Sequence, residues 1–421
     1  MQTRAPSLLL VVTSCGMLAG WSTTILAAGY KLPETSTNAT ALSAAYVANA
    51  EGPDASYYNP AGMALNDGGA AIRGDLTLAH LPSIQFRGTQ FIPGASSVPA
   101  SDDSETENIP VPSMHYVSPY VGNARFGLSM VTPGGLSKRW EGWGATAAKE
   151  FSLQAVEINP TVGYRLSDRL AVGGGARMIY SRGVVKSTVP ASIFRDLEGD
   201  SIDFGYNLAI HYRPTTRLAL AATYRSKIDL TIEGDARLGV GGGATTLYDD
   251  STRLTVPLPA ALAIAAAFDV GNDTTVEFVY ERTYWSSYRE LDFEYGATVP
   301  APLVPRFDDP IDKDWKNVST YRLGITQRLN DQWTVLGGLV LDESPAPGKT
   351  IGFELPESDG KIFSLGARYK ASRHLEVDAA VLYTQRDSLD LTAAGNDNGL
   401  TGRFSDAGAL LVSMGVVYSF D

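Results

Sequence analysis

Most of this sequence alternates between apolar and polar residues, and the alternation continues from about residue 69 to the end of the chain. In the last segment one parity is small or polar, whereas the other is large and apolar, comprising Leu410, Val412, Met414, Val416, Tyr418 and Phe420. A period of two residues is typical of a β-strand whose two faces meet different environments. The sequence therefore predicts a protein built mainly of such strands.

Fourteen segments carry this pattern, at residues 69–86, 109–120, 124–140, 150–166, 169–186, 199–213, 217–233, 252–270, 274–286, 315–329, 332–343, 360–371, 374–386 and 408–420. The connections between them are alternately short and long. The long ones are predicted at 87–108, 141–149, 187–198, 234–251, 287–314, 344–359 and 387–407. An even number of strands joined in this way is typical of a transmembrane β-barrel of a bacterial outer membrane. The predicted fold is all-β, a 14-stranded antiparallel barrel.

The faces of the strands agree with a membrane barrel. In the seventh segment one predicted face is apolar, with Leu218, Leu220, Ala222, Tyr224, Ile228, Leu230 and Ile232. Thr223, Arg225, Lys227 and Asp229 form the other face. A soluble sandwich also alternates, but here many strands carry charges on the second face. Because a lipid-facing Arg costs about 2–4 kcal/mol, the apolar face is predicted to meet lipid and the charged face a wet lumen.

The N-terminal part of the chain lacks the alternation. Arg4, the apolar run from Leu8 to Leu18 and the small residues Ala27 and Ala28 indicate a secretory signal peptide over residues 1–28. Residues 29–68 are predicted to form a small separate module, and residues 69–421 the barrel.

Composition excludes several classes of chemistry. The only cysteine, Cys15, falls in the predicted signal peptide, so a disulfide, a Cys-ligated metal and a Cys nucleophile are not expected. The four histidines are far apart, and a net charge of −12 disfavours nucleic acid as a partner. The sequence predicts no catalytic residues, no metal and no cofactor.

One predicted strand is interrupted. Pro133-Gly134-Gly135-Leu136 lies within the third segment, where proline removes a ladder donor and glycines weaken pairing. In a closed barrel this would open a gap in the wall; the alternative is a strand end or a β-bulge without function.

The lumen is predicted to contain several cations, namely Arg177, Arg225, Lys227, Lys316, Arg322 and Arg368. Most of them are expected to form structural ion pairs with the N-terminal module or with acidic residues that share the interior, namely Glu157, Glu277, Glu281, Glu376 and Asp378. A subset, for which Lys316, Arg322, Arg177 and Arg225 are the candidates, could bind an anionic head group.

Several motifs together resemble the FadL-type long-chain fatty acid and hydrocarbon transporters of Gram-negative outer membranes. They include Gly29-Tyr30-Lys31-Leu32-Pro33-Glu34, Tyr57-Tyr58-Asn59-Pro60-Ala61-Gly62-Met63, Thr132-Pro133-Gly134-Gly135-Leu136 and Asp314-Trp315-Lys316. The resemblance implies that residues 29–68 are a hatch that plugs the barrel, with Gly29 and Tyr30 at its start and the Asn59-Pro60-Ala61 turn inside the lumen. It also implies that Pro133, Gly134, Gly135 and Leu136 make a lateral gate, and that Lys316 matches a basic residue of the lumenal pocket.

The expected function is passive uptake of hydrophobic compounds, with long-chain fatty acids as the expected substrates and aromatic or alkane hydrocarbons as the alternative. An outer-membrane lipid-modifying enzyme and a general aqueous porin are readings from other classes. The expected partners are hydrophobic small molecules, the lipid bilayer with its lipopolysaccharide, and the outer-membrane assembly machinery, with the protein acting as a monomer.

Overall fold

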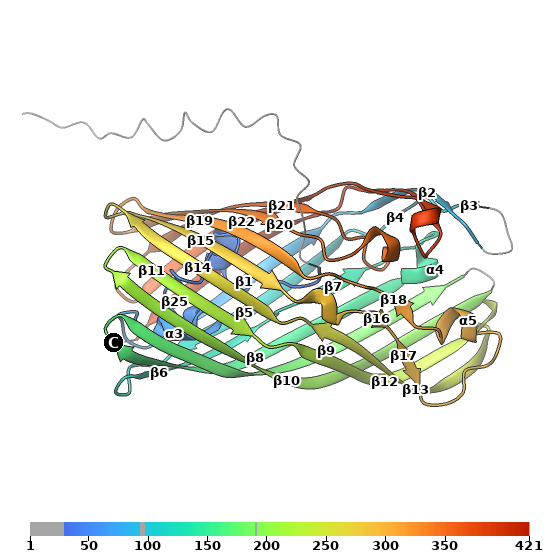
Figure 1. Cartoon of the computed structure of the whole chain (residues 1–421), viewed down its shortest axis with the longest axis horizontal. Coiled ribbons are helices and arrows are strands. Elements are labelled where there is room, and N and C mark those ends of the chain that lie inside the picture. Colours follow the sequence, from blue (N-terminus) through green and yellow to red (C-terminus); the bar gives the residue numbers. More distant parts are fainter. Residues whose placement is uncertain (1–28, 93–96, 190–191, 421) are drawn as a thin grey trace, which may run out of the picture.

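The computed structural model describes residues 29–92, 97–189 and 192–420, so the predicted signal peptide, with Cys15, lies outside the described residues. The described chain forms a closed antiparallel barrel of fourteen strands, in which β1 pairs with β25 to complete the cylinder (Figure 1). The barrel strands and strand pieces are β1 (Ala71–Leu81), β5 (Glu107–Val117), β6 (Ala124–Val131), β7 (Gly135–Lys138), β8 (Glu150–Ser167), β9 (Leu170–Thr188), β10 (Ile193–Thr215), β11 (Leu218–Arg225), β12 (Ile228–Val240), β13 (Thr245–Leu258), β14 (Ala261–Val270), β15 (Thr274–Thr283), β17 (Phe293–Tyr295), β19 (Val318–Arg328), β20 (Trp333–Asp342), β21 (Gly360–Lys370), β22 (Leu375–Arg386) and β25 (Gly408–Ser419).

The predicted barrel is confirmed, but two of the predicted long loops are wrong. Residues 187–198 and 234–251 mostly continue strands β9, β10, β12 and β13, which turn only at their far ends. These segments are polar, yet they still pair, and ion pairs such as Arg182–Glu198 and Arg253–Glu233 link their exposed faces. Outside the membrane a strand needs hydrogen-bonded neighbours but no apolar face, so the barrel wall rises far above the lipid on this side.

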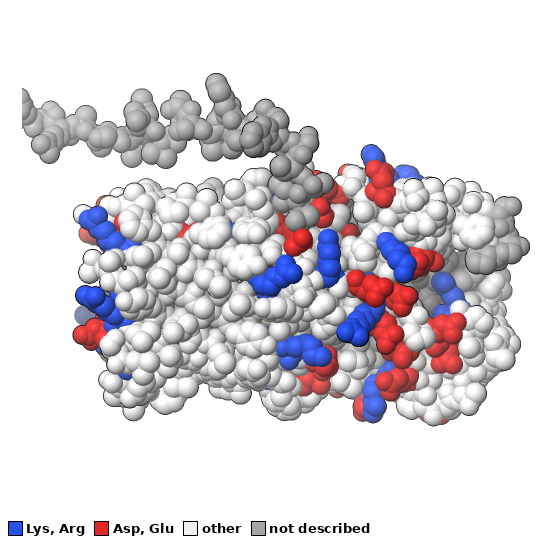
Figure 2. All heavy atoms as spheres, viewed as in Figure 1, with Lys and Arg blue, Asp and Glu red and all other residues white. Residues whose placement is uncertain are grey.

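The outer face of the other half is apolar. Phe204, Leu365 and Met414 are 70%, 63% and 67% exposed, and they point away from the barrel axis. Figure 2 shows a band free of charged side chains between the short-turn end and the middle of the barrel, whereas acidic and basic groups gather over the half with the long loops. This band is the surface that faces lipid.

The long loops carry small elements of their own. β2 (Gln85–Gln90), β3 (Val98–Pro99), β4 (Asp102–Asp103), β23 (Leu389–Leu391) and β24 (Leu400–Ser405) form a second sheet, and β16 (Glu290–Leu291) pairs with β18 (Ile311–Asp312). The helices here are α4 (Ala145–Ala148), α5 (Val304–Phe307), η1 (Gly241–Gly243), η2 (Trp285–Ser287), η3 (Gly348–Thr350) and η4 (Ala393–Gly395). Within the described ranges no helix is long and apolar enough to cross a membrane.

Residues 29–68, called the N-terminal segment below, lie inside the barrel. The segment contains α1 (Thr37–Ala41), α2 (Ala55–Tyr58) and α3 (Pro60–Met63), and these helices are buried throughout. The helix α1 packs on β20, β21 and β22, whereas α3 packs on β8, β9 and β10. The segment thus contacts opposite sides of the inner wall.

The seventh strand exchanges its faces halfway along. Leu220 is exposed to the outside on β11, whereas Ile228, Leu230 and Ile232 on β12 are buried inside. Arg225 pairs with Asn207, and Glu233 pairs with Asp200. Between these two pairs the seventh strand advances by eight residues, whereas β10 advances by seven. One extra residue at Ser226-Lys227 therefore makes a β-bulge that turns the following residues over.

The bulge corrects the prediction that Leu218 to Ile232 share one face. It also corrects the lumenal position predicted for Lys227, whose side chain is exposed on the outside and pairs with Asp229 at 2.7 Å. The eighth strand turns over at the same level, because Ala261 and Ala263 point inward on β14 while Leu254, Val256 and Leu258 point inward on β13. Beyond the membrane the charged side chains of these two strands face the surrounding water, and their apolar side chains line the interior of the barrel.

Candidate functional site

The strand pairing that forms the barrel wall is interrupted in the third strand. β6 ends at Val131 and β7 begins at Gly135, as the Pro133 motif predicts. Residues 30–32 of the N-terminal segment fill this interruption: the Leu32 amide donates to the Pro133 carbonyl at 3.0 Å, and the Gly135 amide donates to the Tyr30 carbonyl at 3.0 Å. Lys31 and Gly134 form the bridge between these two bonds. The break is therefore covered by a short piece of strand that belongs to no neighbouring hairpin.

An ion-pair group holds this piece in place. The Lys31 ammonium lies 2.7 Å from Glu281 on β15, and both side chains are largely buried. Burial lowers the pKa of Lys31, although Glu281 opposes this effect. The Arg322 guanidinium lies 3.4 Å from Glu281 and 3.9 Å from Glu34, and it donates to the Ser43 carbonyl at 3.0 Å. Glu34 itself is buried, and burial raises its pKa to about 7, against the pull of Arg322.

The structure places Arg177 and Arg225 beside Glu157, each at 2.8 Å. Arg225 also donates to the Tyr57 carbonyl at 2.9 Å and lies over the Tyr57 ring. Together with Arg322, these predicted ligand-binding cations bind carboxylates and backbone of the protein itself. Their charges are compensated without a ligand, and Arg225 and Arg322 tie the N-terminal segment to the wall.

The predicted Asn59-Pro60-Ala61 turn lies against the wall and begins α3. The Asn59 side chain accepts from the Gly62 amide at 3.0 Å and donates to the Val47 carbonyl at 2.8 Å. A Cβ atom at Gly163 would lie only 2.2 Å from the Pro60 carbonyl oxygen, and one at Gly173 2.6 Å from the Ala61 nitrogen. Glycines in β8 and β9 thus let the turn approach the wall closely.

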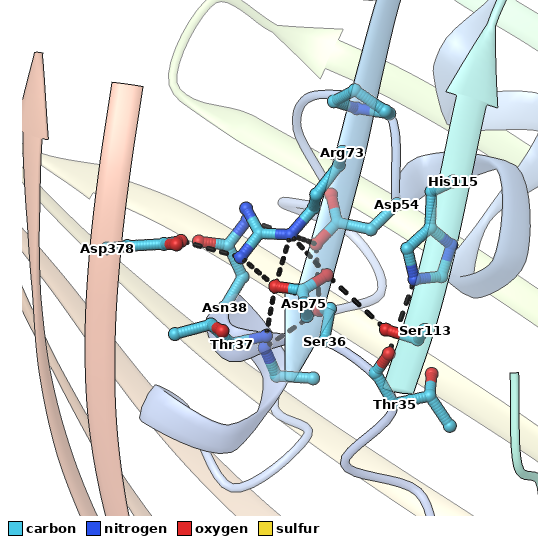
Figure 3. A network of polar contacts seen from close by, with 12 residues as sticks. Thr35, Ser36, Thr37, Asn38, Asp54, Arg73, Asp75, Ser113, His115 and Asp378 are labelled. Atoms are coloured by element: carbon cyan, nitrogen blue, oxygen red, sulfur yellow. Dashed lines mark hydrogen bonds and ion pairs between the residues drawn. The ribbon is translucent and has the colours of Figure 1, made fainter. Parts of the chain in front are cut away.

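A second buried network joins the segment to the strands near the barrel seam (Figure 3). Arg73 of β1 is fully buried and donates to Asp75 at 2.6 Å and to Asp378 at 2.6 Å. Asp54 lies 3.8 Å away, and Asp75 accepts the Thr37 amide at 2.9 Å. The interior position predicted for Asp378 agrees with this placement. Arg73 was not predicted as a lumenal cation, although its parity with Asp75 and Thr77 places it on the polar face of β1.

An apolar cavity lies directly beside the covered break. It is lined by Leu136, Leu153 and Val185 on one side, and by Ile232, Leu254, Val256, Tyr30 and Trp315 on the other. Only about 40 Å³ is free in it, far less than the roughly 300–1,000 Å³ of ordinary ligand pockets. Side chains must therefore move apart for a ligand to enter.

One ion pair faces this apolar cavity. Lys313, 4% exposed, lies 2.5 Å from Glu354. Burial alone would raise the pKa of Glu354, but the Lys313 ammonium holds it below its usual value. The pair comes from two different long loops and supplies the only charges of the lining among the residues that the structure describes.

The structure places Lys316 on the surface, outside the lining of this cavity. Its parity with Arg322 suggested a lumenal position, but β19 begins only at Val318 and the backbone turns at Asp314, where φ is +46°. Alternation cannot be extended through such a turn. Lys313 shares its parity with the buried Trp315, and this was the signal that could have identified it.

Comparisons with known proteins agree with the fold. The model of the family described as outer membrane protein transport protein (OMPP1/FadL/TodX) matches residues 18–420. The long-chain fatty acid transport protein of Salmonella typhi is 24% identical, over 67% of this chain and 71% of its own. Outer membrane protein P1 of Haemophilus influenzae is 23% identical, over 94% of this chain and 95% of its own.

Solved structures show the same architecture. A Pseudomonas aeruginosa FadL homologue superposes with a TM-score of 0.80 at 20% identity, covering 94% of this chain and all of that one. The toluene transporter TodX of P. putida superposes with a TM-score of 0.69 at 15% identity, covering 91% of this chain and 98% of that one. At these identities the likeness concerns the fold.

Proposed function

The chain belongs to the OMPP1/FadL/TodX family of outer-membrane transporters of hydrophobic compounds, and we propose that it takes up long-chain fatty acids passively, with lateral exit at the covered break. In this proposal the N-terminal segment acts as a hatch. Ligand enters the apolar cavity from the side of the long loops and leaves sideways into the membrane when residues 30–32 move. A chain gains about 0.8 kcal/mol for each buried CH₂, which is enough to collect it from dilute solution.

The observation that carries the proposal is the shared wall. Tyr30 lines the cavity and its carbonyl closes the break, while Leu136 lines the cavity and follows the break directly. A ligand that displaces Tyr30 therefore acts on the closing strand itself. In this proposal one displacement of Tyr30 both makes room for the ligand in the cavity and uncovers the gap in the wall.

The ion pair of the cavity favours a ligand with a carboxylate. Lys313 is the one cation among the described residues that line this mainly apolar cavity, and a fatty acid could exchange its carboxylate for that of Glu354. We expect Lys313, rather than Lys316, to meet the ligand. Exchange of one carboxylate for another avoids leaving a buried cation without a partner.

A second candidate function is uptake of aromatic hydrocarbons. Tyr30, Tyr288 and Trp315 line one end of the cavity and form a cluster with Trp285, mostly packed edge to face, with ring centroids 4.7–6.1 Å apart. Such a cluster suits a flat apolar ligand. The two functions predict different effects of Lys313. The variant Lys313→Met combined with Glu354→Gln should reduce uptake of labelled oleate about tenfold or more and leave that of toluene unchanged. Uptake of toluene by the wild type, together with an oleate uptake that the double variant does not change, would favour hydrocarbons.

A cross-link tests the exit. Lys31 and Gly134 face each other between two hydrogen bonds, which is the arrangement that brings opposite Cβ atoms closest in an antiparallel pair. In the variant Lys31→Cys with Gly134→Cys, oxidation should abolish uptake, and reductant should restore it. The reduced double variant is the baseline, and the two single variants are further controls, because a Cβ atom at Gly134 would crowd the Tyr30 carbonyl and the loss of Lys31 removes its pair with Glu281. Undiminished uptake by the oxidised protein would exclude this exit.

A further inference from the structure

A hollow opens on the outside of the barrel where the seventh and eighth strands turn over. It has a volume of about 380 Å³. Its lining consists of Lys227, Ala260, Tyr284, Ser286, Ser287 and Arg289. Lys227 points outward, because Ile228 next to it faces the interior, and Arg289 is also exposed. The hollow is therefore separate from the apolar cavity, which lies on the other side of the wall.

The wall here is interrupted in three neighbouring strands. β11 gives way to β12 at Ser226-Lys227, β14 is separated from β13 by Pro259-Ala260, and β15 ends at Thr283 before η2. The Tyr284 amide donates to the Ala260 carbonyl at 2.9 Å, which keeps the wall closed behind the hollow. The result is a fixed recess in a closed surface.

The chemistry of the recess is that of an anion site. Two cations line it and no carboxylate does. The Arg289 guanidinium makes no ion pair with any residue in the described ranges, while its carbonyl accepts the amides of Lys313 and Asp314 at 2.7 and 2.9 Å. The backbone that carries Arg289 is thus fixed, and its charge is uncompensated.

The remaining groups are compatible with an oxyanion. Lys227 has one acidic partner, Asp229 at 2.7 Å, and both side chains are nearly half exposed, so the pair is weak. The Ser286 hydroxyl makes no hydrogen bond with the described residues, and its amide is held by Asn317 at 2.9 Å. Two cations and a free hydroxyl can satisfy several oxygens of one phosphate.

The position of the recess relative to the membrane determines which anion can reach it. Tyr224 and Ile264 face lipid on one side of it, and Asp229 and Glu233 face water on the other. In Figure 2 the uncharged band gives way to charged groups near the middle of the barrel. With the long loops outside the cell, this boundary is the headgroup level of the outer leaflet. We propose that the recess binds a phosphate of an outer-leaflet lipid of the lipid A type.

The test uses the full barrel, purified in detergent and stripped of lipid. Binding of diphosphorylated lipid A, and of the same lipid without phosphates, is measured by native mass spectrometry. Wild-type protein should bind the phosphorylated lipid, and Lys227→Gln with Arg289→Gln should weaken this binding at least about tenfold. Heat-modifiable migration and uptake, which should not change, show that the variant is folded.

Arg253→Gln is the matched control. Arg253 is an exposed arginine on the same outer wall, pairs with Glu233 at 2.7 Å and does not line the recess. Its removal should leave lipid binding unchanged. Equal binding of the lipid without phosphates, or an undiminished affinity in the double variant, would overturn the proposal. Displacement of the lipid by millimolar inorganic phosphate would do so too, because it would show a site for free anions. If the double variant does not fold, Lys227→Gln alone is expected to give a smaller loss in the same direction, and no loss counts against the proposal.

Discussion

The barrel wall is interrupted at two places, and the interruptions differ in what repairs them. At residues 132–134 the backbone finds its partners in the N-terminal segment, which no hairpin holds. At Ser226 the neighbouring strand repairs the gap: the Ser226 amide donates to the Tyr206 carbonyl at 2.9 Å, and the Tyr206 amide donates to the Ser226 hydroxyl at 2.9 Å. A gap in the strand pairing can open only if the segment that fills it can move away. By this criterion the first interruption is a candidate exit and the second is not.

The largest expected effect comes from reversing the charge of Lys31, which holds residues 30–32, the closing strand, against the wall. In Lys31→Glu two carboxylates would face each other where Lys31 and Glu281 now lie 2.7 Å apart. Breaking a buried pair in this way costs about 3–5 kcal/mol. Residues 30–32 should then detach, and ion conductance in planar bilayers should rise. The swap Lys31→Glu with Glu281→Lys should return conductance toward the wild-type value; a conductance unaffected by Lys31→Glu would mean that the strand is held otherwise.

Glu34 predicts a pH dependence at the first interruption. Burial raises its pKa from 4.5 to about 7 in the docked segment, so docking takes up a proton. The contribution is fully present below about pH 4.5 and is lost as pH rises through 7, a change of up to about 3 kcal/mol. Conductance and uptake should therefore be greater at pH 8 than at pH 5. Glu34→Gln should behave at both pH values like the wild type at pH 5, and a persisting pH dependence would assign it to another group.

Two adjacent glycines give a matched pair of variants. A Cβ atom at Gly134 would lie 2.9 Å from the Tyr30 carbonyl oxygen, whereas one at Gly135 would lie at an ordinary 3.4 Å from the Leu153 carbonyl oxygen. Gly134→Ala should therefore push the closing strand away at a cost of about 1–3 kcal/mol and increase conductance. Gly135→Ala should leave it unchanged. Equal conductances for the two variants would show that Tyr30 does not close the gap.

The smallest effect is expected at the second interruption. Ser226→Ala removes the hydroxyl that accepts the Tyr206 amide at 2.9 Å, which costs about 1 kcal/mol. The temperature at which the barrel unfolds in detergent should fall slightly, and uptake and conductance should stay the same. Ser286→Ala, which removes an exposed hydroxyl without a hydrogen bond to the described residues, is the control. A rise in conductance with Ser226→Ala would remove the distinction between the two interruptions.

The strands could be predicted because lipid imposes a strict alternation, and Pro133-Gly134 could be found because it breaks that alternation. The turnover at Ser226 could not. The same parity is apolar on both sides of Ser226, at Tyr224 and at Ile228, since the extra residue and the exchange of environments cancel each other, and a single polar residue does not indicate a bulge. Only the register against a neighbouring strand reveals it.

The candidate site was harder to predict than the wall. Arg177 and Arg225 are lumenal as expected, but the sequence does not show that both meet Glu157. The surface position of Lys316 and the place of Lys313 in the cavity lining could not be predicted, because parity has no meaning in a loop that turns at Asp314. The ends of β9 and β10 were also missed, because strands beyond the membrane carry charged outer faces that resemble loops.

The turnover also affects how thick a membrane the protein fits. The apolar parity from Leu218 to Ile232 covers fifteen residues, which on a strand tilted by about 45° would span roughly 35 Å. Only the part up to Tyr224 meets lipid, and the rest lies inside the barrel. The hydrophobic thickness that this side of the barrel presents is therefore well below the value that its sequence suggests. Such a surface matches a thin bilayer, as the bacterial outer membrane is, and would be mismatched in a thicker one.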